Sequence, residues 1–308
     1  MHISINDTRL YVDVDGSELR VDRDFLLTVP TIVVLHGGPG FDQGYLRPGI
    51  GPLRDVAQLV FVDLRGQGRS DEVPVETVTL EQMADDVVEL CGVLGIERPV
   101  LLGHSAGGFV ALHAARRVPG AFGGLVLCNT SATLAPDPDP GGPSLADRAG
   151  PEAVEVAGRV FAGDISPEVN EAFGRLVAPY YASPEHPEVP GRLFPLSSLS
   201  FDVARHFFTT QAPRYDLRDR LGEITAPALV VAGGWDWVCP PAAARTIAAG
   251  IPVAELVILD GAGHFSFSEE PDLFHRAVRE FLDGLRMGRR SPAETTDGRG
   301  GGTFRDGR

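Results

Sequence analysis

The sequence predicts an α/β protein with a mostly parallel β-sheet, covered by helices, and an inserted helical cap. Short and almost continuously apolar runs, typical of buried strands, alternate with stretches that have apolar residues at helical spacing. One long section in the middle of the chain breaks this alternation and contains no convincing strand. With 308 residues, 43% of them hydrophobic, the chain can form one large domain with an insertion.

The first part of the chain predicts three strands and one helix. LYVDV (10–14) alternates between apolar and polar residues and is followed by Asp15-Gly16, a hairpin signal. TIVVL (31–35) and LVFVD (59–63) are apolar almost throughout, as strands buried on both faces are. Residues 80–95 have apolar side chains at helical spacing and end on a glycine, which indicates a helix.

The same alternation continues around one glycine-rich turn. PVLLG (99–103) predicts a buried strand, 106–117 a helix that stops near Pro119, and LVLCN (125–129) another strand. Further along, the predicted order is strand, helix, strand, helix, at 228–233, 241–250, 255–260 and 270–285. Each strand followed by a helix implies parallel pairing.

These patterns divide the chain into three parts. We expect a core domain made of residues 1–131 and 224–287, with residues 132–223 forming a helical cap inserted after the strand that ends at Asn129. The polar, glycine-rich tail 288–308 is expected to be disordered.

Composition narrows the class of protein. The net charge of −15 argues against binding to nucleic acid or to anionic membranes. Cys91, Cys128 and Cys239 fit neither a disulfide framework nor a zinc site. We therefore expect a cytoplasmic protein that needs no metal or cofactor, acts on a small molecule or short peptide, and has no membrane partner. The sequence does not indicate the oligomeric state.

Ser105 lies in GHSAGG (103–108), directly between a predicted strand and a predicted helix. A strand, G-x-S-x-G and a helix in that order are typical of a nucleophilic serine on a sharp turn. A serine hydroxyl is a weak nucleophile, so it also requires a base, an acid that orients the base, and N–H donors for the oxyanion.

The rest of the chain offers each of these groups. Of the eight histidines, only His264 follows the last predicted strand and precedes the last helix, so we expect it to be the base. Asp236 follows the preceding strand and is the expected acid, because the alternative acid position holds Asn129. The expected oxyanion donors are the N–H groups of Ala106 and Gly38, with Gly37 as an alternative to Gly38.

At this point the sequence resembles an α/β-hydrolase over residues ~1–286. The motifs HGGPG, DLRGQGRS, GHSAGG, GGWD and GAGHF occur in that family's order. HGGPG together with DLRGQGRS is similar to the proline iminopeptidase group of serine peptidases. That resemblance implies a cap that closes over the site and selects short substrates with a free amino end.

Two positions depart from that group. A bulky aromatic residue usually follows the nucleophile, whereas this chain has Ala106. The group's cap also carries a Glu two residues before a His-Tyr-Phe stretch, and here VARHFF (203–208) has Ala204 at that position. A buried ammonium needs a charge partner, and other cap carboxylates are candidates for it: Glu168, Glu171, Glu185, Glu188 and Asp202. We expect Phe207, Phe208 and Trp235 to line an apolar pocket over Ser105.

The leading hypothesis is a serine hydrolase that cleaves an amide or ester bond through an acyl-enzyme. Within it, the motifs favour an aminopeptidase for N-terminal proline, and Ala204 and Ala106 favour an esterase or lactonase for a small apolar substrate. A ligand-binding protein without turnover, or a lyase or cofactor-free oxygenase that uses the same serine and histidine, is the alternative from another class.

Overall fold

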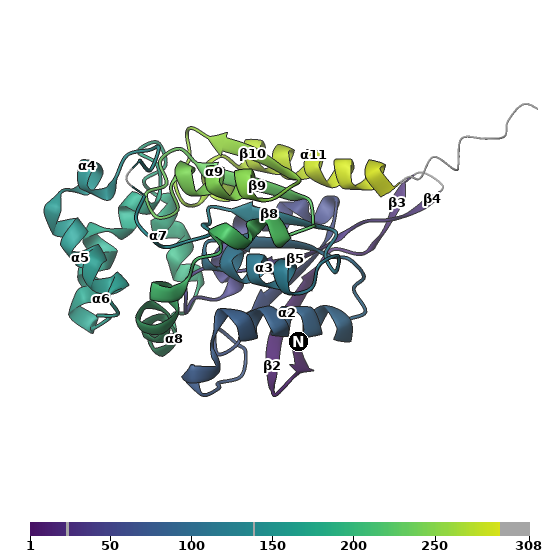
Figure 1. Cartoon of the computed structure of the whole chain (residues 1–308), viewed down its shortest axis with the longest axis horizontal. Helices are drawn as coiled ribbons and strands as arrows, with labels where there is room; N and C mark the ends of the chain where they lie inside the picture. The colour runs from purple at the N-terminus through teal and green to yellow at the C-terminus, as the bar shows by residue number, and fades with distance from the viewer. Residues whose placement is uncertain (23–24, 138, 290–308) are drawn as a thin grey trace, which may run out of the picture.

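The computed structural model describes residues 1–22, 25–137 and 139–289. Within them, eight strands form one sheet in the order β1-β2-β6-β5-β7-β8-β9-β10 (Figure 1). β1 pairs antiparallel with β2 and β2 with β6, and every other neighbouring pair is parallel. The strands of this sheet are β1 (His2–Ile5), β2 (Thr8–Asp15), β5 (Thr31–Leu35), β6 (Gln58–Asp63), β7 (Val100–His104), β8 (Gly124–Cys128), β9 (Ala228–Gly233) and β10 (Ala254–Leu259). The predicted mostly parallel sheet is confirmed.

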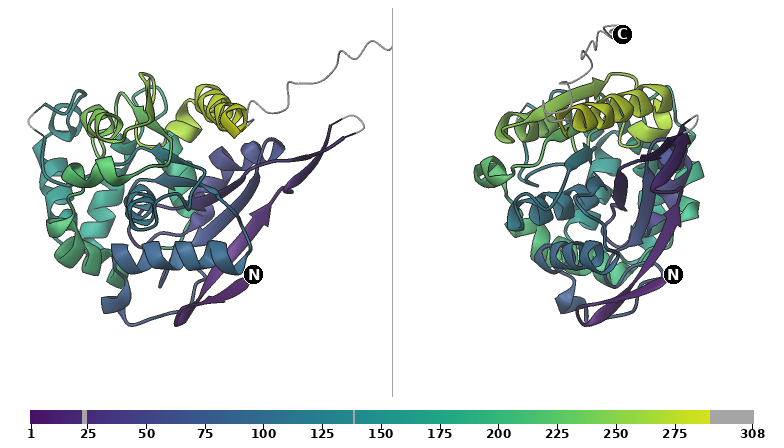
Figure 2. Two further views of the ribbon diagram at one scale, coloured as in Figure 1. Left: turned by 45° about the vertical axis from the view of Figure 1, so that its right-hand side comes forward. Right: turned by 90° about the vertical axis from the view of Figure 1, so that its right-hand side faces the viewer.

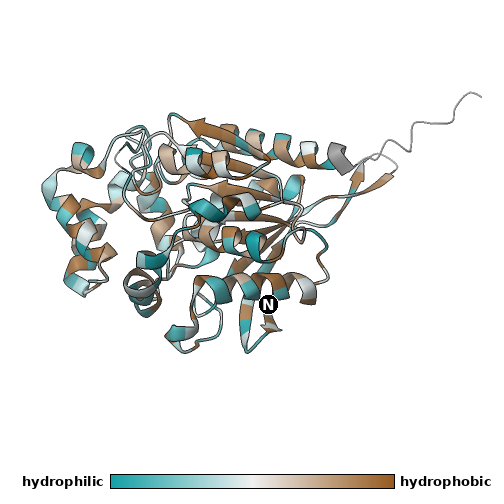
Figure 3. Ribbon diagram, viewed as in Figure 1, coloured by the Kyte–Doolittle hydropathy of each residue, from teal (hydrophilic) through white to brown (hydrophobic). Residues whose placement is uncertain are grey.

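Helices cover both faces of the sheet, and the central strands are apolar for that reason (Figure 3). In β5, Val33 and Leu35 pack into one hydrophobic cluster while Ile32 and Val34 pack into the other. The first cluster includes side chains of α2 (Leu80–Val93), α3 (Ala106–Arg117) and α9 (Pro241–Gly250). The second includes side chains of α1 (Arg47–Ile50), α10 (Ser266–Glu269) and α11 (Pro271–Arg289). Successive side chains of a strand point to opposite faces of the sheet, so a strand between two helical layers is apolar at every position.

The cap lies between β8 and β9 and is built from helices. They are α4 (Leu145–Ala149), α5 (Pro151–Phe161), α6 (Pro167–Leu176), α7 (Val189–Leu193) and α8 (Phe201–His206). The two ends of the insertion run side by side: the Leu217 N–H donates to Ala132 O at 2.7 Å, and Thr133 forms an isolated bridge with Asp216. The short η8 helix (Arg218–Glu223) packs against α9 and α3. The division into domains at 132 and 223 stays a prediction.

A separate hairpin, β3 (Leu19–Asp22) and β4 (Phe25–Thr28), reaches away from the sheet at the end of the molecule opposite the cap (Figure 2). Several of its apolar side chains are exposed, among them Phe25 at 72%. The expected hairpin at Asp15-Gly16 is wrong, because β2 pairs with β1 and β6 and not with the strand that follows it.

Two further features concern the length of the elements. α11 continues to Arg289, two residues into the stretch predicted as a tail, and residues 290–308 lie outside the described part of the chain. In the part that is described, no helix combines the length and the apolar character needed to cross a bilayer.

Candidate active site

Ser105 occupies the turn between β7 and α3, and its backbone is held in a rare conformation with φ of 52°. The Ser105 N–H donates to Cys128 O at 3.0 Å, and the Thr130 hydroxyl donates to Ser105 O at 2.7 Å. A Cβ on Gly103 would meet the backbone of Gly107 at 2.5 Å, so the strand and the helix cross where only glycine fits. This sharp turn carries Ser105 to the start of α3, where the positive end of the helix dipole lies.

His264 and Asp236 lie on the loops that follow β10 and β9, and both are buried. His264 Nδ1 is 2.9 Å from Asp236 Oδ2. Because a carboxylate only accepts, Nδ1 carries the proton and Nε2 is left as the basic nitrogen. The N–H groups of Val238 and Cys239 donate to Asp236 Oδ1.

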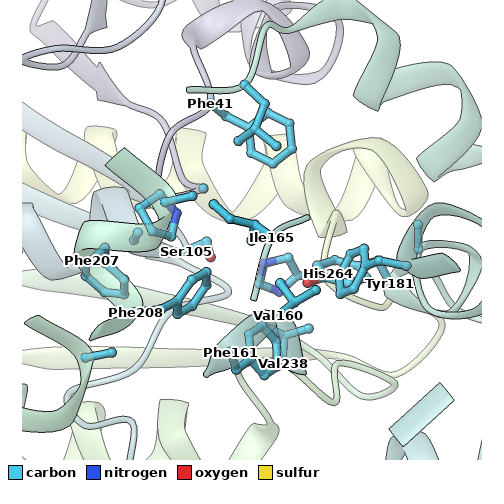
Figure 4. Close-up of a pocket in the computed structure, with 18 of the residues that line it drawn as sticks. Phe41, Ser105, Val160, Phe161, Ile165, Tyr181, Phe207, Phe208, Val238 and His264 are labelled. Atoms are coloured by element: carbon cyan, nitrogen blue, oxygen red, sulfur yellow. The ribbon is translucent and has the colours of Figure 1, made fainter. Parts of the chain in front are cut away.

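Ser105 and His264 both line one cavity, and Figure 4 shows their side chains facing it together. No hydrogen bond between the Ser105 hydroxyl and the His264 ring is present among the described residues. In enzymes without substrate this contact is often long and tightens on binding. The topology therefore brings together three side chains that are far apart in the sequence, because the carboxyl ends of parallel strands meet at one edge.

The loop that carries His264 is held by groups that sequence analysis missed. The His264 N–H donates to Tyr181 O at 2.6 Å. The Glu269 carboxylate accepts the N–H groups of Gly263 and Phe265, the residues on either side of His264, and also that of Ser183 in the cap. Burial raises the pKa of Glu269. Three backbone donors to one carboxylate fix this loop, and no spacing in the sequence indicates them.

The structure distinguishes between the two glycines considered as oxyanion donors. Gly38 and Ala106 both line the cavity. The Gly37 N–H, in contrast, donates to the Tyr45 hydroxyl at 2.7 Å and is already used. Gly38 has a φ of +135°, and a Cβ there would lie 2.8 Å from Phe41 N, so the loop needs glycine. The geometry therefore favours Gly38 over Gly37.

The cavity has a volume of about 660 Å³ and is bounded mainly by apolar side chains of the cap. Phe207 and Phe208 line it, as the sequence predicts. The prediction for Trp235 is wrong: Trp237 lines the cavity instead. The guanidinium of Arg148 lies 5.5 Å from the Trp235 ring and donates to Trp235 O.

The wall of this cavity is free of charged carboxylate, ammonium and guanidinium groups. Its lining, all from described residues, contains no Asp, Glu, Lys or Arg. Ala204, which stands where the iminopeptidase group has a Glu, is part of the wall. None of the five cap carboxylates considered as replacements lines it, and Asp202 faces a separate hollow with Glu72, Arg205 and His206. The polar side chains that do line the cavity are Tyr45, His104, Ser105, Asn170, Tyr181, Trp237, Cys239 and His264.

The family follows from both the fold and a direct match. Residues 30–271 match the family described as alpha/beta hydrolase fold, so the chain belongs to that family. The RutD protein of Agrobacterium fabrum, whose name describes a candidate carbamate hydrolase, is 33% identical over 267 residues, 82% of this chain and 93% of that protein. These matches confirm the resemblance to α/β-hydrolases that the motifs indicate.

Other relatives differ in what they are named for. The proline iminopeptidase PfmaB of Pestalotiopsis fici is 26% identical over 292 residues, 89% of this chain and 99% of that one. The crystal structure of an enol-lactonase from Burkholderia xenovorans has a TM-score of 0.69 at 27% identity, over 92% of this chain and 100% of that one. The relatives are hydrolases, so the chain is an enzyme of that class. They do not single out the iminopeptidase group.

Proposed function

We propose that this chain is a serine hydrolase that cleaves neutral, apolar esters or lactones through an acyl-enzyme. The observation that carries this proposal is the composition of the cavity wall. Around Ser105 and His264 this wall contains no Asp, Glu, Lys or Arg, and it has Ala204 at the position where an ammonium would need a carboxylate. A substrate with a free amino end would bury its charge there without a partner, at a cost of several kcal/mol. The likeness to an enol-lactonase also supports this choice.

In the proposed mechanism Ser105 is the nucleophile and His264 the base. As Ser105 Oγ bonds to the carbonyl carbon, its proton passes to His264 Nε2 and the C=O electron pair moves to the oxygen. The N–H groups of Ala106 and Gly38 stabilise that oxyanion. Asp236 holds the ring in the required tautomer and compensates its positive charge.

The acyl-enzyme then forms and is hydrolysed. The tetrahedral intermediate expels the alkoxide, which takes the proton from His264, and the acyl group stays on Ser105. Water attacks the acyl carbon in the same site while His264 accepts its proton, and Ser105 leaves with that proton. This sequence requires no metal or cofactor.

The experiment is a turnover assay on the wild type and on Ser105→Ala with matched substrates. p-Nitrophenyl butyrate and a medium-chain γ-lactone represent the proposed class. Prolyl p-nitroanilide with a free amine carries a positive charge, which its N-acetyl form lacks. We expect cleavage of the ester and the lactone, with a loss of about 10⁴-fold or more in Ser105→Ala.

Two results would contradict the proposal. Preferential, Ser105-dependent cleavage of the free amine over its N-acetyl form would make the enzyme an iminopeptidase. Saturable binding of these compounds without any turnover would make it a ligand-binding protein on the same fold.

A further inference from the structure

One chain of hydrogen bonds joins the three loops that form the candidate active site. The Gly37 N–H donates to the Tyr45 hydroxyl at 2.7 Å, and Tyr45 Oη lies 2.7 Å from His104 Nδ1. His104 Nε2 lies 2.8 Å from His264 O. The chain therefore begins beside Gly38, passes through the residue before Ser105, and ends on the backbone of the base.

The direction of each hydrogen bond in this chain is fixed by chemistry. A backbone carbonyl only accepts, so His104 Nε2 must carry the proton that is donated to His264 O. Burial lowers the pKa of His104 well below its ordinary value, so the ring is neutral and Nδ1 is an acceptor. Tyr45 then gives its single proton to Nδ1, and its oxygen accepts from Gly37.

Tyr45 and His104 line the cavity, but both are buried and expose little surface to it. His104 is 2% and Tyr45 4% exposed. The His104 ring packs against His264 with centroids 4.8 Å apart and against Phe267 at 5.1 Å. In such an enclosed site, removing one member leaves a buried polar group without a partner.

We propose that His104 and Tyr45 are positioning residues that set the oxyanion loop and the base loop at a fixed separation. This inference rests on the proposed function, because it assigns Gly38 and His264 their roles. The acylation transition state needs both loops in register, whereas binding of an apolar ester depends mainly on the cavity wall. Tyr45 is part of that wall, and Tyr45→Phe keeps its ring there. Breaking one of these hydrogen bonds should therefore lower kcat and leave KM nearly unchanged.

The test compares Tyr45→Phe with Tyr215→Phe. Tyr215 is also buried and donates one hydrogen bond of 2.7 Å, to Ser131 O, but that bond reaches neither the Gly38 loop nor the His264 loop. We expect both variants to lower the melting temperature similarly. Only Tyr45→Phe should lower kcat for p-nitrophenyl butyrate, by about 10–100-fold, with KM within about twofold.

Two substitutions of His104 test its two hydrogen bonds, to Tyr45 and to His264 O, one at a time. His104→Asn places an oxygen near the Nδ1 position and keeps the contact with Tyr45 alone. His104→Gln places an N–H near the Nε2 position and keeps the contact with His264 O alone. Because either half by itself leaves the two loops unconnected, both variants should lose kcat, and an unchanged kcat in a folded variant would overturn the proposal.

A measurement that needs no turnover checks the same chain directly. In ¹⁵N-histidine NMR spectra of the wild type at neutral pH, His104 should appear as the neutral Nε2–H tautomer, and Tyr45→Phe should shift its Nδ1 signal. A protonated Nδ1 in the wild type would overturn the proposal. Absence of Ser105-dependent turnover with the expected tautomer present would instead reject the proposed function alone.

Discussion

Asn129 donates to the same oxygen of Asp236 that faces His264. Asn129 Nδ2 lies 3.0 Å from Asp236 Oδ2, and its second hydrogen is directed to Gly263 O at 2.9 Å. Asn129 has a φ of 47°, a left-handed conformation that Asn adopts more readily than most residues. With the two backbone donors to Oδ1, Asp236 has four hydrogen bonds although it is only 1% exposed.

This arrangement predicts which of two substitutions of Asn129 lowers kcat/KM more. Asn129→Ala removes one donor to Asp236 and should lower kcat/KM by about tenfold. Asn129→Asp has the same shape but sets a second carboxylate about 3 Å from the first, so it should lower kcat/KM further. Steady-state kinetics at neutral pH measures both. Equal losses in the two variants would show that the missing donor accounts for the effect and that the added charge has none.

Ala204 is predicted to determine which charge the pocket accepts. Ala204→Glu introduces a carboxylate into the apolar wall, whereas Ala204→Gln introduces the same bulk without the charge. The preference for free-amine prolyl p-nitroanilide over its N-acetyl form should rise by about tenfold or more in the Glu variant alone. A rise of the same size in Ala204→Gln would mean that size, not charge, controls this wall.

Arg65, from the DLRGQGRS motif, is predicted to stabilise the fold without taking part in catalysis. Its side chain is fully buried, and it donates to both oxygens of Asp86 and to Asp7. Arg65→Met leaves the Asp86 charge buried without its partner, so the free energy of unfolding should fall by about 3–5 kcal/mol.

Urea denaturation of the Arg65 variant gives this value, and the double variant Arg65→Met, Asp86→Leu is its control. Removing both charges should recover most of the loss, since no unpaired ion remains. A single variant as stable as the wild type would contradict the importance of this ion pair.

Glu269 is predicted to make stability depend on pH in a stated direction. Burial raises its pKa in the folded protein above the ordinary value of 4.5. Between these two pKa values the folded state therefore holds a proton that the unfolded chain releases. Its contribution to stability is therefore largest at or below pH 4.5 and falls as pH rises through the raised pKa. The unfolding free energy of the wild type minus that of Glu269→Gln should be larger at pH 4.5 than at pH 7.5. A constant difference would contradict it.

The positions of the main site residues could be predicted because they follow from topology. Ser105, Asp236 and His264 each come directly after a run whose apolar character identifies a buried strand, and parallel strands end at the same edge. The predicted helices and strands of the core match the observed elements to within a few residues for the same reason. Local pattern and fold point to one answer in this part of the chain.

The contacts that could not be predicted depend on partners far apart in the sequence. Trp235 and Trp237 flank Asp236 in the sequence, but Trp235 contacts Arg148, which is 87 residues away, and Trp237 donates to Tyr180 O. Similarly, Tyr45 and His104 meet across 59 residues. No periodicity within a segment reports such contacts, because they arise when separate loops are packed together.

The narrow connection of the cap to the core has a consequence for how this enzyme can diversify. Chain enters and leaves the cap at Ala132 and Leu217, which are hydrogen-bonded to each other, so the cap's ends are already adjacent. The strands that precede Ser105, Asp236 and His264 lie outside this segment, but Tyr181 O and the Ser183 N–H inside it hold the His264 loop. A new specificity can thus be acquired by exchanging one contiguous block of the gene, provided that the block keeps the backbone contacts of Tyr181 and Ser183 with the His264 loop.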